Sequence, residues 1–186
     1  MKIKNIALMA ALSLAALSAQ ALNVVNTIAL DGSAATGYTA GLSDPSGTDV
    51  FHLVSGTFTD RFTFKFTGDS MFDVSLITSA AEDELAAQQI VFTSADVNGI
   101  ALSIKDAKIV FGTVLRSASL LQAGTTSDLV LTVHGYSGLS GSTGADIAAS
   151  YSGTINVTAV PEPETYALML GGLAVIGFVA RRRKIV

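Results

Sequence analysis

Strict alternation of apolar and polar side chains marks one segment in the first half of the chain. The odd positions from Thr57 to Thr67 carry Thr, Arg or Lys, and the even positions between them carry Phe58, Asp60, Phe62, Phe64 and Phe66. Successive side chains of a strand point to opposite faces of a sheet. The pattern predicts a half-buried strand of an antiparallel sheet, with phenylalanine toward the core and threonine toward solvent.

Asp60 interrupts the phenylalanine face of this strand. A buried carboxylate costs several kcal/mol unless it is paired or hydrogen-bonded, and Arg61 points to the opposite face. We expect Asp60 to accept hydrogen bonds from backbone N–H groups at a bend or bulge, or the regular strand to begin only at Phe62. A ligand or ion site is the functional alternative.

Weaker versions of the same alternation recur along the chain. Gly68-Asp69-Ser70 predicts a turn that joins the phenylalanine strand to the next one in a hairpin. Further turns are expected at 96–99 and 105–106, loops at 31–48 and 137–149, and a connector at 117–124, while 79–89 fits either a helix or an ordered loop. The predicted strands cover 22–30, 49–54, 71–78, 90–92, 100–104, 107–115, 128–136 and 151–157.

Many short strands separated by Gly and Ser turns indicate an all-β fold. The expected architecture is an antiparallel β-sandwich or jelly-roll-like domain over residues 22–159.

The first 21 residues have the three parts of a secretory signal peptide. Lys2 and Lys4 precede an apolar run, and Ala19-Gln20-Ala21 is a small-x-small cleavage site, so the mature chain is expected to begin at Leu22. This predicts export through the Sec machinery and cleavage by signal peptidase.

The last 27 residues, 160–186, form a second targeting segment. Pro161-Glu162-Pro163 is a rigid polar hinge, because proline cannot continue a strand or a helix interior. An uncharged apolar stretch over 166–180 follows, and Arg181, Arg182, Arg183 and Lys184 close it with a basic stop. The apolar stretch predicts a short transmembrane helix, although it is below the usual length of about 20 residues. A plain C-terminal membrane anchor is the alternative.

This tripartite tail resembles the PEP-CTERM sorting signal of Gram-negative bacteria. The resemblance implies recognition by an exosortase, a membrane-embedded transpeptidase, and removal of the tail near Pro-Glu-Pro. Phe58, Asp60 and Phe62 also resemble the signature of the FxDxF subset of these proteins. Further similar segments are Leu121-Gln122-Ala123-Gly124, Val133-His134-Gly135 and Tyr151-Ser152-Gly153-Thr154-Ile155; Thr125-Thr126-Ser127 departs from the aromatic that tends to follow the Ala-Gly.

Charge and composition narrow the function further. Residues 22–160 hold thirteen acidic and five basic side chains, which argues against a nucleic-acid partner because such proteins usually carry a basic surface. The chain has no cysteine, so it has neither a disulfide nor a thiolate site.

No catalytic motif occurs in the sequence. His52 and His134 are isolated, and Glu82-Asp83-Glu84 fits a solvated acidic turn better than a metal cluster. We expect a non-enzymatic protein without cofactor or metal, placed at the cell surface or in an exopolysaccharide (biofilm) matrix. The alternative is an extracellular module that binds a polysaccharide or calcium, and a hydrolase ranks third.

Overall fold

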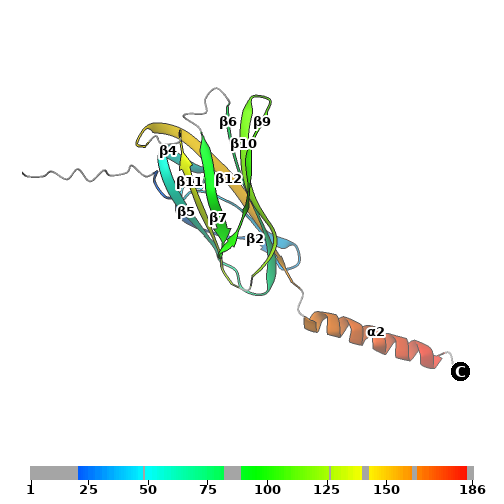
Figure 1. Ribbon diagram of the computed structural model, residues 1–186. Coiled ribbons are helices and arrows are strands. Elements are labelled where there is room, and N and C mark those ends of the chain that lie inside the picture. The colour runs from blue at the N-terminus through cyan, green and yellow to red at the C-terminus, as the bar shows by residue number, and fades with distance from the viewer. Residues whose placement is uncertain are drawn as a thin grey trace, which may run out of the picture.

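Two β-sheets pack face to face, and a helix leaves the body at its C-terminal end (Figure 1). The computed structural model describes residues 21–47, 49–81, 89–125, 127–139, 143–160 and 163–183. The predicted signal sequence up to Gln20, including Ala19, lies outside the described residues, as do Pro161, Glu162 and the acidic run at 82–84.

The first sheet is built around the phenylalanine strand. Its order is β1 (Val25–Ile28), β5 (Gly56–Phe64), β11 (Leu129–Ser137), β7 (Ile90–Val97) and β8 (Ile100–Ala101). All neighbours are antiparallel except β1 and β5, which run parallel.

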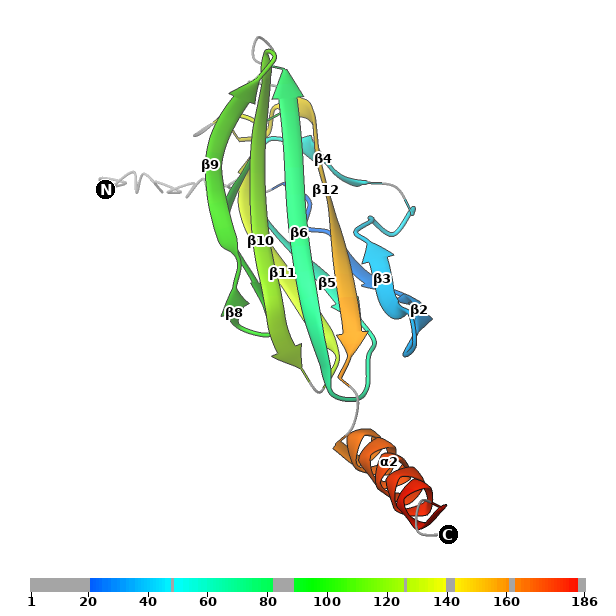
Figure 2. The same cartoon turned by 90° about the vertical axis from the view of Figure 1, so that its right-hand side faces the viewer.

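The second sheet contains the longer strands. Its order is β2 (Asp31–Ser33), β3 (Gly37–Gly41), β12 (Asp146–Ala159), β6 (Ser70–Ala81), β10 (Thr113–Thr125) and β9 (Ser103–Val110). β4 (Val50–Val54) pairs with the first part of β12, and β3 pairs with its later part (Figure 2).

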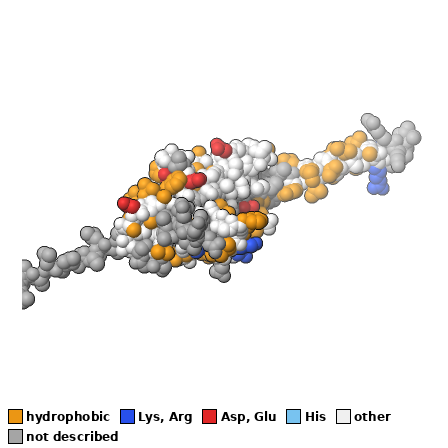
Figure 3. Space-filling model, turned by 90° about the horizontal axis from the view of Figure 1, so that it is seen from above, with side chains coloured by type: hydrophobic (Ala, Val, Ile, Leu, Met, Phe, Trp, Pro, Cys, Tyr) orange, Lys and Arg blue, Asp and Glu red, His pale blue; other side chains and the backbone are white. Residues whose placement is uncertain are grey.

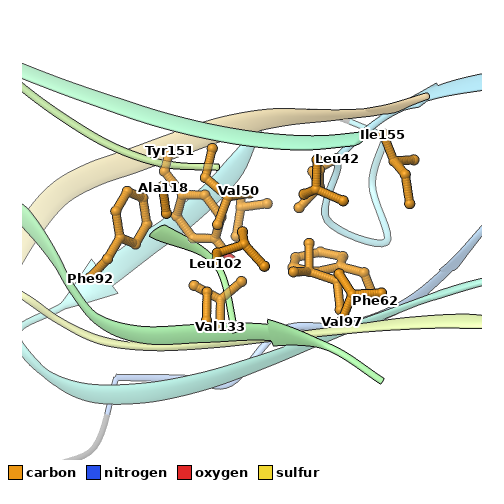
Figure 4. Packing of buried hydrophobic residues seen from close by; sticks show 14 of the residues in the cluster. Leu42, Val50, Phe62, Phe92, Val97, Leu102, Ala118, Val133, Tyr151 and Ile155 are labelled. Atoms are coloured by element: carbon orange, nitrogen blue, oxygen red, sulfur yellow. The ribbon is translucent and has the colours of Figure 1, made fainter. Parts of the chain in front are cut away.

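Inward side chains of the two sheets meet in one core. The burial of β5 alternates as the sequence predicts, with Phe58, Asp60, Phe62 and Phe64 all buried. Phe66 lies beyond the end of β5 and is only half-buried. Figure 4 shows the packing between the sheets, where the labelled core residues are Leu42, Val50, Phe62, Phe92, Val97, Leu102, Ala118, Val133, Tyr151 and Ile155.

The predicted hairpin between the phenylalanine strand and the next strand is wrong. β5 and β6 follow each other in sequence, yet β5 pairs with β1 and β11 while β6 pairs with β10 and β12. The connection through Gly68-Asp69-Ser70 therefore crosses from one sheet to the other. Gly68 has φ +107, so the turn itself is present, but the apolar faces of the two strands face each other across the core.

Several predicted loops and turns are strands instead. The 31–48 loop contains β2 and β3, and the 117–124 connector lies within β10. β9 continues through Lys105-Asp106, with a register shift against β10 at this point, and the chain turns later, at Phe111-Gly112. Ser79 belongs to the end of β6, and 82–88 lies outside the described residues. Cross-strand pairing overrides weak local propensity in these Gly- and Ser-rich stretches.

Candidate functional site

A buried carboxylate lies between the two sheets. Asp60 of β5 is fully buried, and both of its oxygens accept hydrogen bonds. Oδ1 accepts the backbone N–H of Val24 at 2.8 Å, while Oδ2 accepts the Tyr151 hydroxyl at 2.7 Å and lies 3.0 Å from Nε2 of His52. We call Asp60, His52, Tyr151 and the Val24 N–H the Asp60 network.

The Asp60 network connects parts of the chain that are far apart. His52 lies on β4 and Tyr151 on β12, so both donors come from the sheet opposite β5. Val24 precedes β1 and its carbonyl accepts the N–H of Arg61, so the start of the body is held at the same place. A hydrogen bond to a charged group contributes about 1.5–3 kcal/mol.

His52 is held by stacking as well as by its hydrogen bond. Its ring lies 4.1 Å from that of Phe58 at an interplanar angle of 21°, and Tyr151 stacks more distantly on both rings. A carboxylate only accepts hydrogen bonds, so Nε2 donates to Asp60. Nδ1 is buried and has no hydrogen-bond partner among the described residues. In the Nε2–H tautomer, the unpartnered atom Nδ1 carries a lone pair and no hydrogen.

The same burial keeps Tyr151 protonated. Removal from water, together with the charge and the hydrogen bond of Asp60, raises the pKa of Tyr151 well above its ordinary value of 10.0. A tyrosinate beside a buried carboxylate would place two negative charges in a low-dielectric interior. Tyr151 thus acts as a hydrogen-bond donor, and its ring also meets Phe92 edge-on at 5.4 Å.

The expected structural role of Asp60 needs one correction. β5 is regular from Gly56 and pairs with β11 without a register shift, so neither a late strand start nor a bulge accommodates Asp60. One backbone N–H does bond to it, as expected, but two side chains supply the other donors. Sequence analysis missed His52 and Tyr151 as partners of Asp60, although each shares a face of its predicted strand with apolar residues: His52 with Val50, and Tyr151 with Ile155.

Two other segments of the family resemblance lie at irregular or tightly packed points of the sheets. Gly135 pairs with Phe58 across β11 and β5, and a Cβ on it would lie 2.6 Å from Cζ of Phe58 and 2.5 Å from the Val91 carbonyl. Gln122 has φ +55 at a register shift of β10, and Asp73 Oδ1 accepts its N–H at 2.6 Å. The lack of a side chain at Gly135 therefore leaves room for the ring of Phe58. The Leu-Gln-Ala-Gly segment forms a bulge in β10.

The predicted start of the mature chain lies beside the motif strand. Leu22 is exposed, and Oδ1 of Asn23 accepts the N–H of Thr59 at 2.8 Å. Ala21, on the other side of the predicted cleavage point, is buried, and its N–H donates to the Thr57 carbonyl at 3.1 Å.

An open cleft of about 380 Å³ lies at the end of β5. Tyr38 meets Phe66 edge-on at 5.4 Å in its wall, and Lys65 pairs with Asp128 at 2.7 Å. The hydrogen bond from Lys65, and then that from the Phe66 N–H, lower the pKa of Asp128 below its ordinary value of 3.8. The described residues contain no group of three His, Cys, Asp or Glu side chains placed to hold a metal ion.

The tail forms the helix α2 (Pro163–Arg183). It extends beyond the predicted 166–180 range at both ends. At its start, proline is tolerated because the first position of a helix needs no N–H donor. Figure 3 shows exposed apolar side chains along it and basic ones near its end, and the guanidinium of Arg182 lies 5.6 Å from the Phe178 ring centroid. Within the described parts of the chain, no helix has the length and apolar character needed to cross a membrane.

One protein-family model matches this tail. The model of the PEP-CTERM protein-sorting motif covers residues 159–184, which include Pro161, Glu162, Pro163, Arg181, Arg182 and Arg183. The chain carries the PEP-CTERM protein-sorting motif. This motif implies an exported protein that is held at the membrane and then cut, with an exosortase as its processing partner.

Two further comparisons concern the rest of this PEP-CTERM protein. No curated protein sequence matches the chain. Among solved structures, it is similar to the pre-peptidase C-terminal domain of a collagenase from Bacillus anthracis, with 13% identity, coverage of 74% of this chain and 95% of that chain, and a TM-score of 0.23. A likeness of this size does not define the fold.

Proposed function

We propose that this PEP-CTERM protein is an exported structural component of the cell envelope or of the exopolysaccharide matrix, and that its β body has no catalytic activity. The observation that carries this is the position of the sorting motif, which starts at the last residue of β12 and is followed by α2. A folded body therefore precedes the signal, as expected of a cargo that is delivered and then cut from its tail.

The Asp60 network supports a structural role for the motif residues. Phe58, Asp60 and Phe62 are buried, and both oxygens of Asp60 already accept hydrogen bonds from the protein itself. A buried carboxylate whose two oxygens are both hydrogen-bonded by the protein is suited to ordering a core. We assign the chain to the FxDxF subset on these residues, with the motif acting as a tie between the sheets.

Intact mass spectrometry of the protein from its native host tests the proposal. The expected species begins at Leu22 and lacks everything after about Pro163. Deletion of 161–186 is the control, and it should give secretion without the cut. A wild-type species that retains α2 would make the tail a permanent anchor, and an organism without an exosortase gene would contradict sorting. New reducing ends in matrix polymers incubated with the mature body would contradict the absence of catalysis.

Polysaccharide binding is a second candidate, favoured by the cleft that Tyr38, Phe66, Lys65 and Asp128 line. Aromatic faces beside charged groups suit a sugar ring, which has both apolar and hydroxyl surfaces. Calorimetric titration of the mature body with the native polysaccharide tests it, comparing Tyr38→Ser with Tyr136→Ser, a matched change of another half-buried tyrosine on β11. Binding lost only in Tyr38→Ser would support the cleft, and equal binding would exclude it.

A calcium titration followed by melting temperature tests the calcium alternative, since a ligand that binds only the folded state raises stability.

A further inference from the structure

The β body is paired right up to the sorting signal. Ala159 still pairs with Ser70 at the end of β12, and the N–H of Val160 donates to the Asp69 carbonyl at 3.0 Å. α2 begins at Pro163, so Pro161 and Glu162 alone separate a hydrogen-bonded residue from the helix. Extended chain covers at most about 3.6 Å per residue, so this connection can span only on the order of 10 Å.

So short a connection has a consequence for any enzyme that cuts near Pro161–Pro163. The enzyme must approach to within about 10 Å of the end of the body from which the tail leaves (Figure 2). That end carries a hollow of about 590 Å³. We call its lining the tail-end face, represented by Ser70, Met71, Asn98, Ile100, Ser127 and Val160.

The tail-end face has the composition of an interaction surface. Met71, Ile100 and Val160 are 41%, 41% and 44% exposed although all three are large and apolar. Polar groups surround them, as at the rim of protein interfaces. Exposed apolar residues that gather in a polar frame mark interaction sites more often than scattered ones do.

A buried hydroxyl provides a second, independent observation. Ser70 is 2% exposed and lines the hollow, and its Oγ has no hydrogen-bond partner among the described residues. A buried hydroxyl left without a partner costs about 1–3 kcal/mol. A polar group from a bound partner would remove that cost.

We propose that the tail-end face is a docking surface for the exosortase, so that the enzyme recognises the folded body as well as the tail. This rests on the proposed function, because it requires that the tail is cut. The chemistry of the face calls for an apolar enzyme surface that contacts Met71 and Ile100 and a hydrogen-bonding group that reaches Ser70.

A pulse-chase of the full-length protein in its native host tests the docking surface. The double variant Met71→Ser/Ile100→Ser should be processed about tenfold more slowly than wild type, as truncation of central interface contacts predicts. The control is Leu53→Ser/Ile109→Ser, whose side chains are 65% and 57% exposed on β4 and β9, toward the opposite end of the body (Figure 2). It should be processed at the wild-type rate. Equal rates for both double variants would overturn the proposal.

Two measurements distinguish enzyme docking from steric obstruction and from membrane binding. Insertion of eight Gly and Ser residues between Val160 and Pro161 should not accelerate the cut, and a faster cut would show that the body merely obstructs the enzyme. Binding of the purified body to vesicles of anionic lipid, lost in Met71→Ser/Ile100→Ser, would make the membrane the occupant and overturn the proposal.

Melting temperature checks that the variants are folded, and Met71→Gln replaces the double variant if that variant is destabilised. If wild type itself keeps its tail, the proposed function fails instead.

Discussion

The hydroxyl of Tyr151 donates to Oδ2 of Asp60 at 2.7 Å across the interior of the sandwich, although 91 positions separate the two residues. Tyr151 lies on β12 and Asp60 on β5, so the bond joins the two sheets directly. A buried charge is tolerated only when donors surround it, and here a tyrosine, a histidine and a backbone N–H do so. Stability should therefore depend strongly on each member.

Replacing the carboxylate should be the most damaging change in the network. Asp60→Ala removes the acceptor of three buried donors, and we expect a loss of about 3–5 kcal/mol in the free energy of unfolding. Tyr151→Phe removes one hydrogen bond to a charged group and should cost about 1.5–3 kcal/mol. Urea denaturation of both single variants and the double variant measures their coupling.

Additive losses in that double-mutant cycle would contradict the direct interaction, because residues in contact show coupling. A melting temperature of Asp60→Ala equal to that of wild type would refute the buried-acceptor role altogether. Asp128→Ala removes a carboxylate from the exposed pair with Lys65 and serves as the control, for which little change is expected.

Stability should fall at alkaline pH because of Tyr151. Its pKa is raised in the folded state, so the fold favours the protonated phenol. This contribution is complete below the ordinary value of 10.0 and is lost as pH rises from there toward the higher folded pKa. Urea unfolding between pH 8 and about pH 11 should show the decline, and Tyr151→Phe should remove part of it. An unchanged slope in Tyr151→Phe would assign the decline to other groups.

Gly135 should not tolerate a side chain. A Cβ there would lie 2.5 Å from a backbone carbonyl and 2.6 Å from the Phe58 ring, so Gly135→Ala should cost about 1–3 kcal/mol through overpacking. Gly124→Ala is the matched control, because a Cβ at Gly124 meets no atom within 4 Å. Thermal melts of both variants measure the difference. A Gly135→Ala melt that matches wild type would mean that β11 and β5 can move apart without cost.

The turn between β9 and β10 should be improved by asparagine. Phe111 is fully exposed with φ +49, and Gly112 follows with φ +74, a pair of left-handed residues typical of a tight hairpin. A bulky residue rarely adopts this conformation, whereas asparagine does so easily. Phe111→Asn should raise the free energy of unfolding by about 1 kcal/mol in urea denaturation. A loss of stability would show that the exposed ring makes a compensating contact.

Much of the β body could be anticipated from local pattern. The alternation around Phe58, Phe62 and Phe64 predicted both the strand and its buried face, because period 2 follows from strand geometry alone. The all-β class followed from the recurrence of such strands. The strands that sequence analysis missed, such as β2 and the middle of β10, are rich in small and polar residues whose extended form depends on a neighbouring strand.

The sorting tail was predicted from the sequence itself, because it is read from one short contiguous segment: hinge, apolar run and basic cluster in order. The signal peptide stays a prediction of the same local kind. The net negative charge of residues 22–160 follows from composition alone and needs no structure. Only the tertiary structure decided which strands pair, why β5 and β6 lie in different sheets, and which donors meet Asp60. Those relationships join distant residues, such as Thr39 and Asn156, which are hydrogen-bonded across β3 and β12 and lie 117 positions apart. Their choice depends on the packing of the whole core, which no local window contains.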